Sequence, residues 1–283
     1  GPFAVLDAIY SGVQKVRAAA PDQALAQLRV MWSPDNVPAG GNTEAELIEG
    51  QIGTSFYIFD STNGHRLFLL GAANADTDEY DSHVVAHEWG HYFQEALSRN
   101  DSGGGSHGPD DKLDMRVAFS EGWGNAWAGI ALGDPRYADS LDSGQARGFI
   151  LDVSQAPTSN RGWFSEASVQ YLLWQYADTQ AIGFGALFEV LTGAPLRTSS
   201  VLVAIHQFSD LLKTARPAAA GSIASLLAGQ LITGTDGLGS GETNDGGGAA
   251  VLPLYGTYSS GSQTICVNDN AGRPNKLGNF VYR

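Results

Sequence analysis

The pentapeptide His-Glu-Trp-Gly-His at residues 87–91 constrains the local fold of this chain more than any other feature. Two histidines four residues apart lie on one face of an α-helix, where their imidazole rings can converge on a single zinc ion. Glu88 is then beside the metal, as the general base for a metal-activated water must be. The sequence therefore predicts a helix that carries His87 and His91 as zinc ligands and Glu88 as a catalytic base.

The same helix needs an apolar face that anchors it in a core. A separate stripe at helical spacing meets this need: Val85, Trp89, Tyr92 and Ala96. Asp81 or Ser82 can cap its N-terminus. His83 precedes His87 by one turn, but one straight helix cannot arrange three imidazoles tetrahedrally around one ion. We therefore expect His83 to be exposed or to support a ligand.

A catalytic zinc ion needs a third protein ligand and one open coordination position. The metzincin arrangement, with a Gly three residues and a third His six residues after the second His, is excluded because Gln94 and Leu97 occupy those positions. A Glu from a later helix is the other arrangement. Glu121 fits it, because it lies in a segment of apolar and small residues where an unpaired carboxylate would be costly to bury.

Asn125 follows Glu121 by one helical turn and can accept a hydrogen bond from a ligand imidazole, which would fix the orientation of the ring. The alternative is that Glu121 is an ordinary solvated charge on its helix. In that case the third ligand would come from a reserve set between the two helices: His107, Asp110, Asp111 and Asp114.

Residues 87–91 together with the segment Ser120-Glu121-Gly122-Trp123-Gly124-Asn125-Ala126 resemble the gluzincin metallopeptidases. The Glu-Gly-Trp piece is most similar to the EGWSDA stretch of fungalysins, within the thermolysin-like group. The resemblance covers residues 80–130. It implies a zincin fold, one zinc ion held by His87, His91 and Glu121, and hydrolysis of peptide bonds with Glu88 as the base.

Two positions depart from the family pattern. Asn125 stands where the family has an Asp, and a neutral side chain orients a ligand less strongly. The family's downstream His, which stabilises the oxyanion, would fall at Gly162. The Gly-x-Met-Glu-Asn exopeptidase motif is also missing, because neither Met31 nor Met115 precedes a Glu. The resemblance therefore favours an endopeptidase over an aminopeptidase.

A tetrahedral oxyanion needs a hydrogen-bond donor besides the metal. Tyr171 is the first candidate because it lies on the helix that follows the third-ligand helix, although a core tyrosine is the alternative interpretation. The other candidates are Arg161, His107 and His206. We expect the strand at residues 66–70 to bind an extended peptide substrate by β-augmentation.

The 16 Lys and Arg against 30 Asp and Glu give a formal net charge of -14, which disfavours nucleic acid and anionic lipid as partners. No apolar run is long enough for membrane insertion. A peptide or protein substrate is the expected partner, and the sequence does not indicate an oligomeric state. The high Gly and low Lys content is typical of a secreted or periplasmic bacterial protein, whose signal peptide we expect to be absent from this chain. The single Cys266 excludes an intrachain disulfide.

The pattern predicts an α+β, zincin-like fold with the active-site helix at a junction. We expect an N-terminal α/β lobe at 1–100, a mainly helical lobe at 101–250 that carries the third ligand, and a β-like tail at 251–283. The expected strands are 28–32, 54–59 and 66–70. The expected helices besides the one after residue 81 are 3–20, 114–132, 144–153, 164–178, 183–192, 198–214 and 221–231.

Two acidic segments are candidates for Ca²⁺. Residues 76–81 match no EF-hand spacing, and a solvated helix N-terminus is the favoured interpretation. The Gly-rich segment 233–248 is expected to be a surface loop or disordered. Two alternatives to a peptidase remain open at this stage: a non-catalytic binding protein that keeps a zincin fold, and a latent or truncated peptidase.

Overall fold

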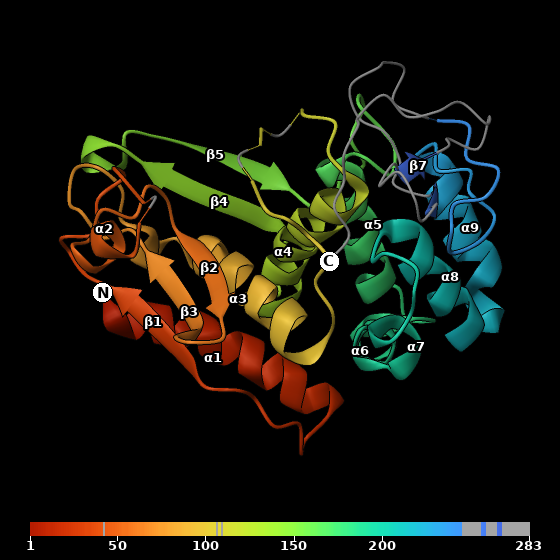
Figure 1. Cartoon of the computed structure of the whole chain (residues 1–283), viewed down its shortest axis with the longest axis horizontal. Helices are drawn as coiled ribbons and strands as arrows, with labels where there is room; N and C mark the ends of the chain where they lie inside the picture. Colours follow the sequence, from red (N-terminus) through yellow and green to blue (C-terminus); the bar gives the residue numbers. More distant parts are fainter. Residues whose placement is uncertain (42, 106, 109, 245–255, 259–264, 268–283) are drawn as a thin grey trace. The chain divides into compact units, whose positions relative to one another are not determined.

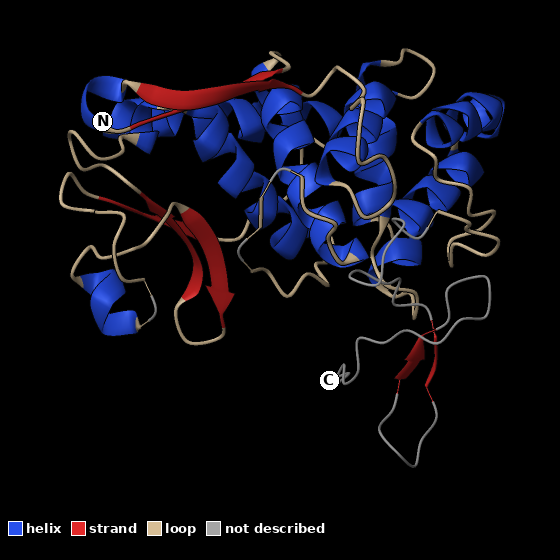
Figure 2. Ribbon diagram, turned by 90° about the horizontal axis from the view of Figure 1, so that it is seen from above, coloured by secondary structure: helices blue, strands red, loops and turns tan. Residues whose placement is uncertain are grey.

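The computed structural model describes residues 1–41, 43–105, 107–108, 110–244, 256–258 and 265–267. The chain is α+β, as predicted: helices outweigh strands in its regular secondary structure, and the strands form small separate sheets (Figure 2). It divides into two compact units, Gly1–Ser98 with Trp123–Ser154 and Arg99–Gly122 with Gln155–Arg283. None of the helices in the described ranges combines the length and apolar character that crossing a bilayer requires.

The first unit carries the predicted active-site helix (Figure 1). Its elements are α1 (Pro2–Ala19), β1 (Leu28–Trp32), α2 (Glu44–Ile48), β2 (Phe56–Asp60), β3 (Gly64–Leu69), the 3-10 helix η1 (Asp78–Tyr80), α3 (Ser82–Leu97), the later part of α4 (Met115–Leu132), β4 (Arg136–Leu141) and β5 (Arg147–Asp152). The segment from Trp123 to Ser154 belongs to this unit although it follows residue 100.

A three-stranded sheet in the order β1-β3-β2 lies beside α3. β1 runs parallel to β3 and β2 runs antiparallel to it, so Leu67 of β3 faces Val30 on one side and Tyr57 on the other. Both edges of β3 are therefore paired. The prediction that strand 66–70 takes up a substrate by β-augmentation is wrong, because this binding mode needs an unpaired strand edge.

The core of the first unit is an aromatic cluster between α3 and α4. Trp89 stacks on Trp127 with ring centroids 5.2 Å apart, and Phe93 packs against both Trp123 and Trp127. Trp123 Nε1 donates a hydrogen bond of 2.9 Å to the carbonyl of Gly90. Val85, Trp89 and Tyr92 of the predicted apolar stripe are buried, which confirms the helix face inferred from the sequence.

Residues 144–153 do not form the predicted helix. Arg147–Asp152 within this range form β5, which pairs antiparallel with β4, with Ala138 opposite Ile150 and Asp139 opposite Phe149. The left-handed φ values of Gly144 (69°) and Gly148 (143°) are incompatible with a continuous α-helix. Cross-strand pairing with β4, the strand just before this segment, decides the structure here, and helical periodicity in the sequence does not indicate that pairing.

The acidic stretch at 76–81 is not a solvated helix start. Asp78 and Glu79 are only 4% and 5% exposed. Asp81 is the residue before α3, but its side chain makes no capping hydrogen bond. Its carboxylate instead accepts hydrogen bonds from the backbone N–H and the hydroxyl of Ser140 on β4. The carboxylates of this stretch are thus directed into the unit.

The second unit is mainly helical, as expected for this part of the chain. Its elements are α5 (Glu166–Asp178), α6 (Gly183–Thr192), α7 (Ala194–Arg197), α8 (Ile205–Ala215), the 3-10 helix η3 (Pro217–Ala219), α9 (Ala220–Gly229), β6 (Gly256–Tyr258) and β7 (Ile265–Val267), with the first part of α4. The helix predicted at 198–214 begins only at Ile205. The preceding residues 199–204 are in neither helix nor strand, and the side chains of Arg99 and Asp101 bond to the backbone of Val201 and Val203 there.

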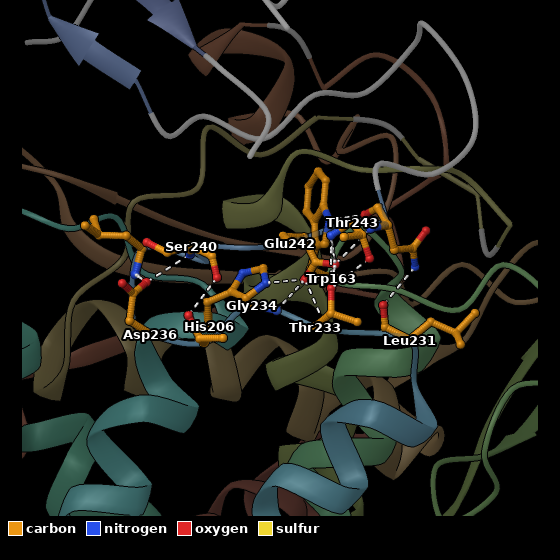
Figure 3. Close-up of polar contacts among 12 residues, drawn as sticks. Trp163, His206, Leu231, Thr233, Gly234, Asp236, Ser240, Glu242 and Thr243 are labelled. Atoms are coloured by element: carbon orange, nitrogen blue, oxygen red, sulfur yellow. Dashed lines mark hydrogen bonds and ion pairs between the residues drawn. The ribbon is translucent and has the colours of Figure 1, made fainter. Parts of the chain in front are cut away.

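Residues 233–244 form a loop, one of the two expected alternatives, and its backbone is held around the buried Glu242 (Figure 3). Glu242 Oε2 accepts hydrogen bonds from His206 Nε2 at 2.9 Å and from the backbone N–H groups of Thr233 and Gly234. Asn244 Nδ2 donates to the carbonyl of Arg161. Residues 245–248 lie outside the described ranges, as does most of the tail at 251–283. Cys266 belongs to β7, which pairs antiparallel with β6.

The environment of Glu242 generates a stability prediction. Burial opposes its ionisation, but the bonds from His206, Asn244 and Thr233 outweigh this effect and lower its pKa from 4.5 to about 2. A lowered folded-state pKa contributes stability that is present above pH 4.5 and is lost as the pH falls through about 2. We therefore expect Glu242→Gln to lower the free energy of unfolding by about 3 kcal/mol at pH 7, since each pKa unit corresponds to about 1.4 kcal/mol.

Urea unfolding at pH 7 and pH 3 measures this difference, which should shrink by about half at the lower pH. The matched control is Glu189→Gln, because Glu189 forms an exposed ion pair with Arg216. Surface pairs contribute about 0–1 kcal/mol. Equal losses in the two variants at pH 7 would contradict the structural role of Glu242.

Candidate metal centre

The side chains of His87, Glu88 and His91 come together on α3. Their ligand atoms lie within 4.8 Å of one another. His87 Nε2 and His91 Nε2 are 3.0 Å apart, and the two rings meet edge to face with centroids separated by 4.7 Å. Two nitrogen atoms bound to one tetrahedral zinc ion at 2.0–2.1 Å would lie about 3.3 Å apart. The spacing of the two imidazoles therefore fits a shared zinc ion.

Asn125 orients one of these imidazoles. Its Oδ1 lies 2.8 Å from His87 Nδ1. An amide oxygen only accepts hydrogen bonds, so Nδ1 of His87 carries the proton and Nε2 presents its lone pair. This is the tautomer that a metal ligand bound through Nε2 requires. The hydrogen bond that the sequence predicts between Asn125 and one of the two imidazoles is thus present.

Gly124 leaves room for the His87 ring. A Cβ atom at position 124 would lie 2.6–2.8 Å from the Cε1, Nδ1 and Nε2 atoms of His87. Gly90 similarly allows α3 to approach α4, since a Cβ there would lie 3.3 Å from the Cα of Gly124. Glycine is a poor helix former, and its presence at these two helical positions is therefore explained by the close contact of α3 with α4.

Two further side chains flank His87. Tyr137 of β4 meets it edge to face at 6.0 Å between ring centroids. His83 Nε2 lies 3.0 Å from the carbonyl oxygen of Asp134, so its ring is directed toward the backbone that follows α4. His83 is therefore held by a main-chain group.

Glu121 belongs to the second unit, on the part of α4 that precedes Trp123. Its side chain is 12% exposed, and its Oε2 lies 3.8 Å from Nε2 of His107. Glu166 Oε2 lies closer to the same nitrogen, at 3.3 Å. The hydrogen bond to Glu166 is the main cause that raises the pKa of His107 to about 9. His107 is therefore an imidazolium at neutral pH and faces two carboxylates.

Sequence reasoning missed Glu166 as a member of this group. The available signal was its position as the first residue of α5, directly after the N-cap Ser165. Acidic residues are common at helix N-termini, so the pattern by itself did not indicate a contact with His107. That contact depends on the path of the segment between α3 and α4, which no local motif specifies.

The comparisons with known proteins address the family of the chain. A family model described as the mycolysin C-terminal domain matches residues 50–230. The chain belongs to the mycolysin C-terminal domain family. This family is associated with peptidases, and mycolysin-like domains occur in secreted peptidases. The predicted relation to thermolysin-like peptidases is supported at this level. Neither the curated proteins nor the solved structures that were compared gave a match.

The matched range of the mycolysin C-terminal domain includes His87, Glu88, His91 and Glu121. It also includes the oxyanion candidates from the sequence. Tyr171 lies half-buried on α5. Arg161 donates to the carbonyl of Gly229. His206 is buried, and its bond to Glu242 helps to hold the loop at residues 233–244. The reserve ligands Asp111 and Asp114 accept hydrogen bonds from Gly108 and Arg116.

The contact between Gly124 and His87 generates a test of the metal centre. We expect Gly124→Ala to lower the zinc affinity at least about tenfold, because the new methyl group displaces the His87 ring from the orientation set by Asn125. Competition with a chromophoric chelator measures the affinity, and circular dichroism checks that the helices persist.

The control is Gly185→Ala on α6, where a Cβ meets nothing within 4 Å. Alanine favours helix at both positions by up to about 1 kcal/mol, so a general effect on helix stability acts equally in the two variants. Unchanged zinc affinity in Gly124→Ala would show that the His87 ring is not a ligand in the orientation described.

Proposed function

We propose that this chain is a zinc-dependent endopeptidase unit in which His87, His91 and Glu121 hold the metal and Glu88 is the general base. The observation that carries the proposal is the convergence of His87 Nε2 and His91 Nε2 at 3.0 Å, with the Glu88 carboxylate in the same group of atoms. Membership of a peptidase-associated family supports it independently.

The donor set suits zinc. Neutral imidazole and carboxylate are common zinc ligands, and two His with one Glu leave the fourth position open for catalysis. Asn125 supports this ligand set, because its bond to Nδ1 fixes the proton there and leaves the lone pair of His87 Nε2 available to a metal ion. Zinc bound there would supply Lewis-acid polarisation of a scissile carbonyl and activation of a water molecule.

The assignment of Glu121 as third ligand rests on its place in α4 and on the resemblance of residues 120–126 to gluzincins. Glu121 precedes Asn125 by four residues in one continuous helix, so the two side chains leave α4 on the same face. Asn125 bonds to the ligand His87. The shared face of α4 is therefore the support for proposing Glu121 as the third ligand.

The position of Glu88 suits a general base that takes up a proton and later delivers it. It is 9% exposed and directly follows a ligand histidine on α3. In the proposed reaction its carboxylate removes a proton from the attacking water and then delivers that proton to the leaving amine. Tyr171 is proposed as the donor to the oxyanion. The substrate is a peptide or protein segment, and the acidic surface together with the family supports a secreted or periplasmic location.

The second candidate function is a domain that binds metal without turnover. The family description favours it, since it names a C-terminal domain and no catalytic activity. The two functions differ in what Glu88 must do. A structural zinc site has no use for a base beside the metal, whereas hydrolysis fails without one. Substitution of Glu88 therefore separates them.

We expect Glu88→Gln to keep its zinc and to lower the rate of peptide hydrolysis by about 10²–10⁴-fold, the usual contribution of a general base. Hydrolysis of casein or a quenched peptide, with metal content measured on the same sample, tests this. Glu95→Gln is the matched control, because it removes one carboxylate from the same helix outside the His-Glu-His group. Equal rates for the parent and Glu88→Gln would remove Glu88 as the base.

Substitution of Glu121 tests the ligand set separately. Glu121→Gln is expected to weaken zinc binding by more than about 100-fold, since loss of a ligand exceeds the 10–100-fold cost of losing a supporting residue. Asp114→Asn, which changes a reserve ligand bonded to Arg116, should keep normal zinc affinity. The opposite pattern, with zinc lost in Asp114→Asn and kept in Glu121→Gln, would overturn the assignment.

A further inference from the structure

Four aspartates of the first unit gather at the start of α3. Asp76, Asp78 and Asp81 come from the stretch before the helix, and Asp139 comes from β4. Each offers a carboxylate oxygen, and these oxygens all lie within 4.8 Å of one another. Only three of the four are close in sequence, so the cluster is a product of the tertiary fold.

Backbone pairing holds the two segments together. Asp76 forms an antiparallel bridge with Leu141 at the end of β4, and the N–H of Asp142 donates to the carbonyl of Ala75 at 2.7 Å. The Ser140 hydroxyl donates to both oxygens of Asp81. The cluster is thus fixed on two sides by main-chain contacts rather than by flexible surface side chains.

Several carboxylate oxygens in this region lack a donor. Asp76 Oδ1 and Asp139 Oδ1 are buried and accept no hydrogen bond, and the same holds for Oε2 of Glu79, a residue that is 5% exposed. Within the part of the chain that the structure describes, no Lys, Arg or His is among the main causes that shift the pKa of Asp76, Asp78 or Asp139. A buried carboxylate oxygen with neither donor nor cation is costly.

The electrostatics of the cluster agree with this deficit. Burial raises the pKa of Asp78, Asp76 and Asp139, and the charges of neighbouring carboxylates raise these pKa values further. For Asp76, hydrogen bonds from Asp78 and from the backbone N–H of Thr77 partly oppose this rise. Only the hydrogen bond from Ser55 to Asp78 clearly favours the ionised form of that residue. The four groups therefore repel one another and gain most from a bound cation.

We propose that Asp76, Asp78, Asp81 and Asp139 bind one Ca²⁺ ion that ties β4 to the start of α3. All the donors are hard oxygen ligands, which suit Ca²⁺ or Mg²⁺ rather than a transition metal. Oxygens that bind one Ca²⁺ at about 2.4 Å lie at most about 4.8 Å apart, which matches the spread of the cluster. Mg²⁺ usually takes only one or two carboxylates and keeps its waters, so four carboxylates favour Ca²⁺.

The position of the site determines its role. Asp81 directly precedes α3, and His87 follows six residues later, about 9 Å along the helix. Asp139 lies two residues from Tyr137, whose ring meets His87. The ion thus fixes both the helix that carries the His-Glu-His group and a strand that packs against it. Its role is structural and independent of peptide hydrolysis.

Calcium binding to the full chain tests the proposal directly. The protein is stripped with EDTA, dialysed, reloaded with one equivalent of Zn²⁺ and titrated with Ca²⁺ by calorimetry. The parent is expected to bind one Ca²⁺, and its Tm should rise by about 5–10 °C at a calcium concentration of about 100 times Kd. A parent that binds no Ca²⁺ up to about 10 mM, the weak limit of calcium modules being about 1 mM, overturns the proposal.

Two variants locate the ion. Asp139→Asn and Asp78→Asn should each lose the calorimetric signal and the Tm shift, while both still bind Zn²⁺. Asp134→Asn is the matched control, because Asp134 is a carboxylate beside the same strand that lies outside the cluster and pairs with Arg136. Calcium binding that persists in both cluster variants, or tighter binding of Mg²⁺ than of Ca²⁺ by the parent, would overturn the assignment of these residues to Ca²⁺.

Discussion

The close approach of α3 and α4 is the contact on which the candidate centre depends. Gly90 and Gly124 face each other, and Trp123 and Trp127 fill the space beside them. A side chain at either glycine would separate the two helices. Only at this distance can Asn125 of α4 reach Nδ1 of His87 on α3. The buried aromatic rings supply the apolar area that stabilises the contact, about 25 cal/mol for each Å² removed from water.

Local periodicity explains what could be predicted from the sequence. The face shared by His87 and His91 follows from a spacing of four residues, and the buried stripe of Val85, Trp89 and Tyr92 follows from the same helix. The bond between Asn125 and His87 was expected from the character of its segment, and the structure contains it. Each of these predictions needed only one helix and one neighbour of known chemistry.

Features that depend on strand pairing were not predictable in this way. The hairpin of β4 and β5 replaces an expected helix because strand pairing and two left-handed glycines determine residues 144–153. Asp139 joins the acidic stretch at 76–81 only because β4 bridges to Asp76. Likewise, β3 is central in its sheet because β1 returns parallel to it. Sequence spacing does not report which strand lies at an edge.

Buried acids in this chain are accommodated in two opposite ways, and their pKa values distinguish the two. Glu242 accepts hydrogen bonds from His206 and from both the backbone N–H and the hydroxyl of Thr233. Three further backbone N–H groups also donate to it, and its pKa falls to about 2. Asp78 is equally buried, but its neighbours are mainly other carboxylates, and its pKa rises. A buried carboxylate that accepts several hydrogen bonds is stabilised as an anion without a metal ion. A group of carboxylates short of donors is stable as anions only when a cation neutralises them. The same physical criterion thus separates the structural acid at Glu242 from the cluster at the start of α3.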